Sequence, residues 1–158
     1  MKLACARSRS SGFTLPELLA VLVVAGIIAA VALPRMTGRT GFEERGFHDQ
    51  LVAALRYGQK SAIAARRTVC ATFTAPRSLA LQISSANGAS DCSVGSALIG
   101  PDGKALSVTA ASSVSYSSAP ASIVFDGNGR PNAAASISIS NLPASLSITV
   151  EAETGYVH

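Results

Sequence analysis

The chain has 158 residues, enough for a short leader, one apolar helix and one domain with a modest core, which excludes a second domain. Its 13 Lys and Arg against 9 Asp and Glu give a net charge of +4. Three of these positive side chains, Lys2, Arg7 and Arg9, lie in the first twelve residues, so the remainder is nearly neutral and gives little reason to expect a polyanion-binding protein.

Residues 18–33 form a run without a charged or hydrogen-bonding side chain. With residues 13–15 the apolar segment reaches about twenty residues, which is enough to cross a membrane as a helix. Glu17 is the ionisable residue inside it, and an unpaired carboxylate in lipid costs roughly 2.5 to 3.5 kcal/mol. Cleavage between Gly12 and Phe13 would place the new α-amine of Phe13 four residues before Glu17, on the same helix face. We therefore expect Glu17 to pair with an amine.

The stretch from Gly12 and Phe13 through Thr14 and Leu15 to Glu17 resembles the class III signal of type IV pilins and type II secretion pseudopilins. The resemblance implies that a prepilin peptidase removes residues 1–12 and methylates the amine of Phe13. It also implies that Glu17 helps to align subunits in a filament. Gly26 and Pro34 fall where the helices of this family loosen.

The basic leader predicts that the N-terminus stays in the cytoplasm, because positive charge near a membrane segment favours the inside. The expected topology is a single pass, over residues 13–33, through the bacterial inner membrane, with the C-terminal domain in the periplasm before entry into a pilus or pseudopilus. Arg35 and Arg39 weaken this bias without reversing it.

A second interpretation is a conventional secretory signal with residues 18–31 as its apolar core. Ala30, Val31 and Ala32 resemble its small-residue cleavage site, which would release a soluble domain starting near Leu33. Glu17 inside the apolar run argues against it, since such a signal requires no acid there.

Residues 34–46 are polar and rich in glycine, and they predict a bend after the membrane segment. From 47 to 67 a helical period returns, with one small apolar stripe and one charged stripe. The apolar stripe consists of Phe47, Leu51, Ala54, Gly58, Ala62 and Ala65. We expect this amphipathic helix to be the spine on which a sheet packs.

Residues 68–158 are predicted to form strands separated by turns. The expected strands are 68–74, 78–84, 105–110, 114–117, 122–125, 136–140 and 145–150, with tight turns at 101–103 and 126–129. The predicted fold class is therefore α+β, pilin-like, in which a long N-terminal helix has a membrane half and an amphipathic half packed on an antiparallel sheet or sandwich. Only eight charged side chains occur in these 91 residues, and such neutral strand faces suit either burial among other subunits or mere compositional drift.

Cys5 lies in the leader, which leaves Cys70 and Cys92 in an oxidising compartment. Alternation within residues 69–73 points Cys70 away from its neighbours, and Cys92 lies in a polar loop that can fold over it. The two are candidates for one disulfide, the alternative being a packed thiol and an exposed one.

The helix with Arg56, Lys60 and Arg66, followed by strand 69–73 and the hairpin 125–130, resembles the minor pseudopilins of the GspH/FimT group. Residues 42–67 and 153–157 further resemble minor pilins of the mannose-sensitive haemagglutinin system. The resemblance implies a non-enzymatic subunit that assembles into, or primes, a type IV pilus or type II secretion pseudopilus. Its partners would be the prepilin peptidase, other major and minor pilins, and the inner membrane.

The residues offer little for chemistry, and we expect no cofactor and no metal. His48 and His158 have no metal-ligand spacing, and residues 126–131 depart from a calcium loop at Arg130 and Pro131. Some FimT-type pilins bind DNA through a Gly-Arg-x-Arg loop, so a DNA-binding minor pilin is the other alternative, with Arg130 as the candidate contact. Five acids against three basic residues from residue 68 onward argue against it.

Overall fold

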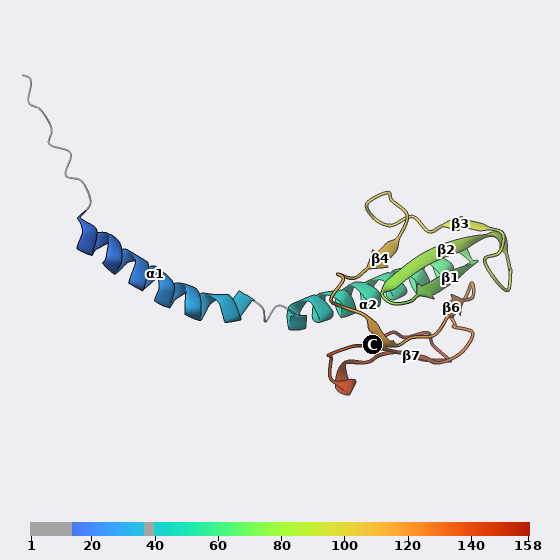
Figure 1. Cartoon of the computed structure of the whole chain (residues 1–158). Coiled ribbons are helices and arrows are strands. Elements are labelled where there is room, and N and C mark those ends of the chain that lie inside the picture. The colour runs from blue at the N-terminus through green and yellow to red at the C-terminus, as the bar shows by residue number, and fades with distance from the viewer. Residues whose placement is uncertain (1–13, 37–39) are drawn as a thin grey trace, which may run out of the picture. The chain divides into compact units, whose positions relative to one another are not determined.

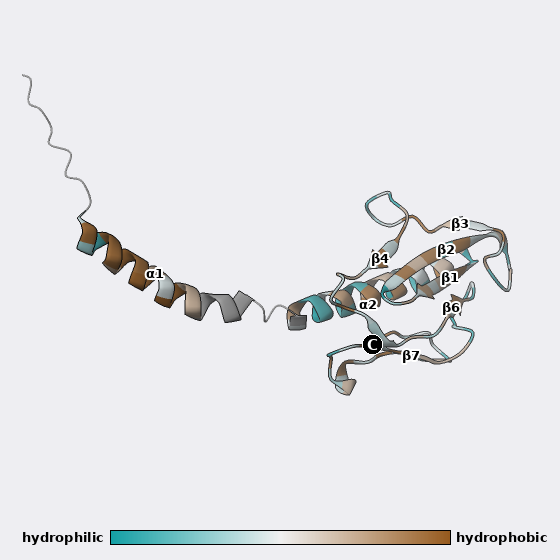
Figure 2. Ribbon diagram, viewed as in Figure 1, coloured by the Kyte–Doolittle hydropathy of each residue, from teal (hydrophilic) through white to brown (hydrophobic). Residues whose placement is uncertain are grey.

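The computed structural model describes residues 14–36 and 40–158, and the chain divides after Arg39 into two compact units. In the first unit, helix α1 spans Leu15–Met36 (Figure 1). Pro16 stands in its first turn, where a residue without an N–H removes no helical hydrogen bond. Gly26 and Pro34 both lie within α1, and Figure 2 shows that its N-terminal part is almost uniformly hydrophobic.

The second unit begins with helix α2, Thr40–Ala65. In the stretch where a bend was expected, residues 34–36 belong to α1 and residues 40–46 to α2. Residues 37–39 lie outside the described residues, so the bend itself stays a prediction. Gly41 and Gly46 weaken a helix, but Glu44 and Phe47 are buried, and tertiary packing of such a face outweighs local propensity.

The C-terminal end of α2 is Ala65 rather than residue 67. Arg66 takes a left-handed conformation (φ 52°), which ends the helix and turns the chain directly into the first strand.

Two antiparallel sheets pack with α2 (Figure 1), which confirms the predicted α+β class. The first sheet has the order β3-β2-β1-β6, with β4 also paired to β2, and the second has the order β5-β7-β8. The strands are β1 Arg67–Thr74, β2 Ser78–Asn87, β3 Gly95–Ala97, β4 Ser107–Thr109, β5 Tyr116–Ser118, β6 Ser122–Phe125, β7 Ala135–Ile139 and β8 Ile148–Val150. A short 3-10 helix, η1, spans Ala144–Leu146.

The structure corrects the expected strands at two places. Strand β3 has no counterpart among them, because Gly, Ser and Ala carry little strand preference and pairing with β2 alone makes them extended. The expected strand at 145–150 begins with the last two residues of η1, so that β8 starts at Ile148. Where alternation is regular the prediction is accurate: Ile137 and Ile139 of β7 are buried, while Ser136 is exposed.

The core lies between α2 and both sheets. Leu51 and Leu55 of α2 are completely buried, as are Phe125 of the first sheet and Ile137 of the second. Each such side chain contributes about 1.5 to 3 kcal/mol relative to exposure.

Small residues of α2 set the distance between the helix and the first sheet. At Gly58 the helix approaches β2 so closely that an added Cβ would lie 2.5 Å from Leu81 Cδ2. Ala62, one turn further along the same stripe, is completely buried. The sheet therefore packs on the apolar stripe that the sequence predicted.

Candidate functional site

The start of α1 holds the acid that the sequence singled out. The backbone N–H and the hydroxyl of Thr14 both donate to Glu17 Oε2, each at 3.4 Å. Thr14 precedes the first helical residue and Glu17 follows three positions later, which is the spacing of a capping box. The carboxylate is thereby turned back towards the residues that precede the helix. Gly12 and Phe13 lie outside the described residues, so the pairing of Glu17 with an amine stays a prediction.

The large apolar side chains of α1 form an exposed surface within the first unit. Leu15 is 79% exposed and Leu22 66%, and the other large apolar side chains from Leu18 to Ile28 are also more than half exposed. Such exposure of apolar side chains marks a surface that another apolar phase or chain covers.

Among the residues that the structure describes, no helix meets the length and hydropathy required of a membrane span.

Cys70 of β1 and Cys92 form a disulfide, with their Cα atoms 6.1 Å apart and the two residues 22 positions apart in sequence. Both residues are buried. The bond fastens the connection between β2 and β3 to the middle of the first sheet. Of the two alternatives that the sequence left open, the structure has the bonded pair.

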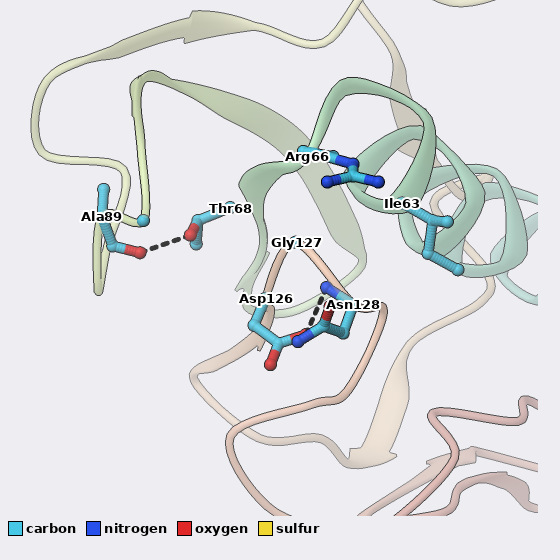
Figure 3. A pocket seen from close by; sticks show the side chains of 8 residues that line it. Ile63, Arg66, Thr68, Ala89, Asp126, Gly127 and Asn128 are labelled. Carbon is cyan, nitrogen blue, oxygen red and sulfur yellow. Dashed lines mark hydrogen bonds between the residues drawn. The ribbon is translucent and has the colours of Figure 1, made fainter.

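A polar pocket of about 630 Å³ lies at the C-terminal end of α2 (Figure 3). One wall is the hairpin after β6, where Asp126 Oδ1 accepts the backbone N–H groups of Asn128 (2.8 Å) and Arg130 (2.9 Å). Another is the segment after β2, where the Thr68 hydroxyl donates to the carbonyl of Ala89. The Asp126 carboxylate therefore closes its own turn, and Phe125 and Pro131 on either side of it pair as an isolated bridge.

The sequence's candidate DNA contact, Arg130, is exposed at a smaller neighbouring pocket that also contains Asp126. Arg66 lines the larger pocket and Arg130 the smaller one, and Asp126 lines both pockets.

No group of three His, Cys, Asp or Glu in the described part of the chain is arranged to hold a metal ion. His48 contacts Asp49 (3.0 Å) and His158 contacts Glu151 (3.2 Å), and each pair has at least one partner that is open to solvent.

Sequence reasoning missed three side chains of α2 that organise the domain. Glu44 is completely buried, and its Oε1 accepts an N–H from the side chain of Asn141 at 3.2 Å. Arg56 donates from Nε and Nη2 to the carbonyl of Val157, at 3.0 and 2.8 Å. Gln59 donates to the carbonyl of Thr154 at 2.8 Å.

Each of these contacts joins residues about a hundred positions apart, so no local pattern in the sequence reveals it. The contact between Thr14 and Glu17 differs, because its spacing of three residues before an apolar run is a recognisable helix-start signal.

Comparison with known proteins gives two family matches, in different parts of the chain. The prokaryotic N-terminal methylation motif covers residues 7–33. The family described as type II transport protein GspH covers residues 49–154, about two thirds of the chain. The chain belongs to the GspH family. The GspH match spans α2 from Asp49 through β8, and the methylation motif contains both Gly12 and Glu17.

Two crystal structures of the type IV minor pilin FimU from Pseudomonas aeruginosa resemble this GspH-family chain. One has a TM-score of 0.55 at 15% identity, and the match covers 76% of this chain and 90% of the FimU chain. The other, in a different crystal form, has a TM-score of 0.50 at 13% identity, with 72% and 90% covered. At this identity the likeness shows the shared fold. No curated protein matches the chain.

The family matches make this GspH-family chain a pilin-like structural subunit of the kind found in type IV pili and type II secretion pseudopili. The resemblance to the GspH/FimT group that the sequence suggested is confirmed.

Proposed function

We propose that the chain is made as a precursor in the bacterial inner membrane and becomes a minor subunit of a pilus or pseudopilus. Residues 1–12 are the leader, residues 13–33 the membrane and filament-core helix, and residues 68–158 the periplasmic β domain carried on α2. A prepilin peptidase cuts between Gly12 and Phe13, and the amine of Phe13 is methylated. The role is structural rather than catalytic.

The observation that carries this proposal is the polar cap at the start of a helix whose residues 18–33 are apolar. Thr14 holds the Glu17 carboxylate at the N-terminal end of α1. In the sequence, Thr14 is the second residue after the bond that the peptidase would cut. Cleavage then creates a cation next to a carboxylate that is costly to leave unpaired in lipid. Helices in lipid gain little from apolar contact with one another, so an ion pair of this kind sets the register of a neighbouring helix. The partner amine belongs to the same subunit or to the next one.

The test of this role separates processing from assembly. Glu17→Ala keeps the cleavage site, so the variant is expected to lose its leader normally but to enter filaments poorly, as measured by the amount recovered in sheared or pelleted filaments. Glu153→Ala removes an exposed acid of the β domain and is the matched control, expected to assemble like the unchanged chain. Normal assembly of Glu17→Ala would refute the role given to this carboxylate.

The cleavage position has its own test. Gly12→Ala, or a bulkier replacement, is expected to retain the leader, which is visible as a slower band on a gel. N-terminal sequencing of the unchanged mature protein is expected to begin at Phe13. A start near Leu33 would instead support the secreted-domain alternative, in which no membrane helix remains.

A further inference from the structure

Two asparagines of the chain, Asn87 and Asn128, are followed by glycine, and the fold places them in different surroundings. Asparagine is a chemically labile side chain. A following glycine makes it more labile, because a residue without a Cβ does not hinder the attack of its own backbone nitrogen on the preceding side-chain amide. The other asparagines, Asn132 and Asn141, precede residues with a Cβ. The two Asn-Gly pairs are therefore the candidate sites for spontaneous loss of ammonia.

The hairpin after β6 protects Asn128. The backbone N–H of Gly129 donates to the carbonyl of Asp126 at 2.9 Å, and the N–H of Asn128 donates to Asp126 Oδ1 at 2.8 Å. Gly129 is also buried, although Asn128 itself is exposed. The nitrogen that would attack the side chain of Asn128 is thus engaged in a hydrogen bond and covered.

The end of β2 leaves Asn87 open to the same reaction. Asn87 is the last residue of the strand, and it pairs with Arg67 beyond a register shift in the ladder. Gly88 is exposed, has φ 73° and has no atom within 4 Å of the position of a Cβ. Its N–H donates no hydrogen bond within the part of the chain that the structure describes. The nitrogen of Gly88 is therefore free to approach the Asn87 side chain.

Arg67 adds a cation at the reacting group. Its Nε donates to Asn87 Oδ1 at 3.3 Å, and both residues are exposed. When a nitrogen attacks the amide carbon, negative charge develops on that oxygen. A donor already directed at the atom where charge develops stabilises the transition state. The fold thus supplies an unhindered nucleophile and an electrostatic stabiliser at Asn87.

We propose that Asn87 is a deamidation site of the folded domain, with the Gly88 nitrogen as nucleophile and Arg67 as stabiliser of the developing charge. The nitrogen bonds to Asn87 Cγ, the Cγ–Nδ2 bond breaks, and Nδ2 leaves as ammonia with the proton that the Gly88 nitrogen gives up. Water then opens the resulting five-membered imide. Opening at Cγ gives aspartate, and opening at the backbone carbonyl carbon gives isoaspartate. The inference does not depend on the proposed function.

The modification alters the pocket at the C-terminal end of α2. Either product places a new carboxylate beside Arg67, and isoaspartate also lengthens the main chain by one carbon immediately before Gly88. Gly88 and Ala89 line the pocket, and the carbonyl of Ala89 accepts the hydroxyl of Thr68 (Figure 3). Because ammonia is lost, the change of charge beside the pocket is permanent.

The test compares the two Asn-Gly pairs within one molecule. The detergent-solubilised full chain is kept at mildly alkaline pH, which favours loss of the proton from the attacking nitrogen. After reduction of the disulfide, trypsin separates residues 78–104, which contain Asn87, from residues 105–158, which contain Asn128, because the bond before Pro131 resists cleavage. Mass spectrometry measures the exchange of ammonia for water in each peptide. Conversion is expected to be several-fold faster at Asn87.

Unfolding the chain tests whether the fold selects the site. In concentrated urea with reductant the hairpin no longer protects Asn128, so the rates at the two pairs are expected to converge. Equal rates in the folded chain, or the same ratio in folded and unfolded chains, would refute a site made by the fold. Asn87→Gln, whose longer side chain cannot form the five-membered ring, is expected to abolish the conversion in residues 78–104. Conversion that persists there would place the reaction at another residue and overturn the assignment.

Substitution of the cation tests its role. Arg67→Gln is expected to slow the conversion at Asn87 several-fold and to leave Asn128 unchanged, and Arg67→Lys is expected to restore part of the rate. Arg45→Gln removes another exposed arginine, on α2, and is the matched control, expected to change neither rate. Denaturant unfolding verifies that each variant is folded. An unchanged or faster conversion at Asn87 in folded Arg67→Gln would refute the part given to Arg67.

Discussion

Gly58 and Gly46 belong to the same helix but have different surroundings. In a helix interior, replacing glycine by alanine ordinarily stabilises by about 0.5 to 1 kcal/mol. Gly46 has open space at its Cβ position, whereas a Cβ at Gly58 would lie 2.5 Å from Leu81 Cδ2 and 3.4 Å from Val69 Cγ1. Leu81 is 1% exposed and has no room to withdraw. The same substitution therefore has opposite consequences at the two positions.

We expect Gly46→Ala to raise the free energy of unfolding by about 0.5 to 1 kcal/mol. Gly58→Ala is expected to lower it by about 1 kcal/mol, since overpacking costs about 1 to 3 kcal/mol and exceeds the gain in helix propensity. Denaturant unfolding of the two variants in parallel measures both. Equal stabilisation by both would mean that α2 does not approach β2 as closely as the structure has it.

Tyr116 is the second residue whose surroundings decide its behaviour. Its ring packs between Phe47 (centroids 5.5 Å apart) and Phe73 (5.8 Å), and its hydroxyl is buried without a partner among the described residues. Burial raises the pKa of Tyr116 from 10.0 to about 12. The folded state therefore keeps this proton where the unfolded chain releases it, so stability falls as the pH rises from 10.0 to about 12.

Tyr116→Phe is expected to remove this part of the alkaline pH dependence. At neutral pH it is expected to leave stability unchanged or slightly higher, because it deletes a buried hydroxyl that has no hydrogen bond among the described residues. The measurement is the free energy of unfolding at several pH values up to about 12, with Tyr156→Phe, at an exposed position, as the control. An unaltered pH profile for Tyr116→Phe would contradict the assignment.

At the scale of elements, the disulfide stabilises a part of the first sheet that has few buried apolar side chains. The residues between β2 and β3 are mostly small or polar, and β3 is exposed along its length. The bond from Cys92 to Cys70 ties this connection to β1. It also holds the segment containing Ala89, which forms one wall of the pocket at the end of α2.

Replacing both cysteines by alanine is expected to lower the free energy of unfolding by about 3 kcal/mol, the value for closing a loop of about 22 residues. A reductant should lower the stability of the unchanged chain by a similar amount and have no effect on the double variant. Denaturant unfolding with and without reductant measures this. A reductant effect that persists in the double variant would show that it acts elsewhere.

The elements that the sequence predicts well are those with a local signal. The motif from Gly12 to Glu17 and the alternation around Ile137 each depend on a few neighbouring residues. The start of α2 and strand β3 escape prediction because contacts far along the chain decide them, with Asn141 for buried Glu44 and β2 for β3. At the glycine-rich positions of α2, local propensity even disfavours the helix that the structure has.

At the scale of the whole molecule, the two units differ in what stabilises them. Every residue of the described hydrophobic core lies at Phe47 or beyond, and none comes from α1. The last residues of the chain are also held within the second unit, by Arg56 and Gln59. The second unit thus has its own core, its own disulfide and its own anchored terminus. These are the properties of an independently folding domain.

A fragment spanning residues 40–158 is therefore expected to fold alone, to form the disulfide when oxidised, and to unfold at nearly the temperature of the domain in the full chain. A fragment starting at Leu51 should be much less stable, because it lacks Phe47, which is 3% exposed, and leaves Asn141 without Glu44. Losing a buried phenylalanine costs about 3 to 5 kcal/mol, a large part of the stability of a domain this small. Thermal unfolding of the two fragments and of the detergent-solubilised full chain measures these stabilities. A fragment 40–158 that fails to fold would show that α1 contributes to the stability of the domain.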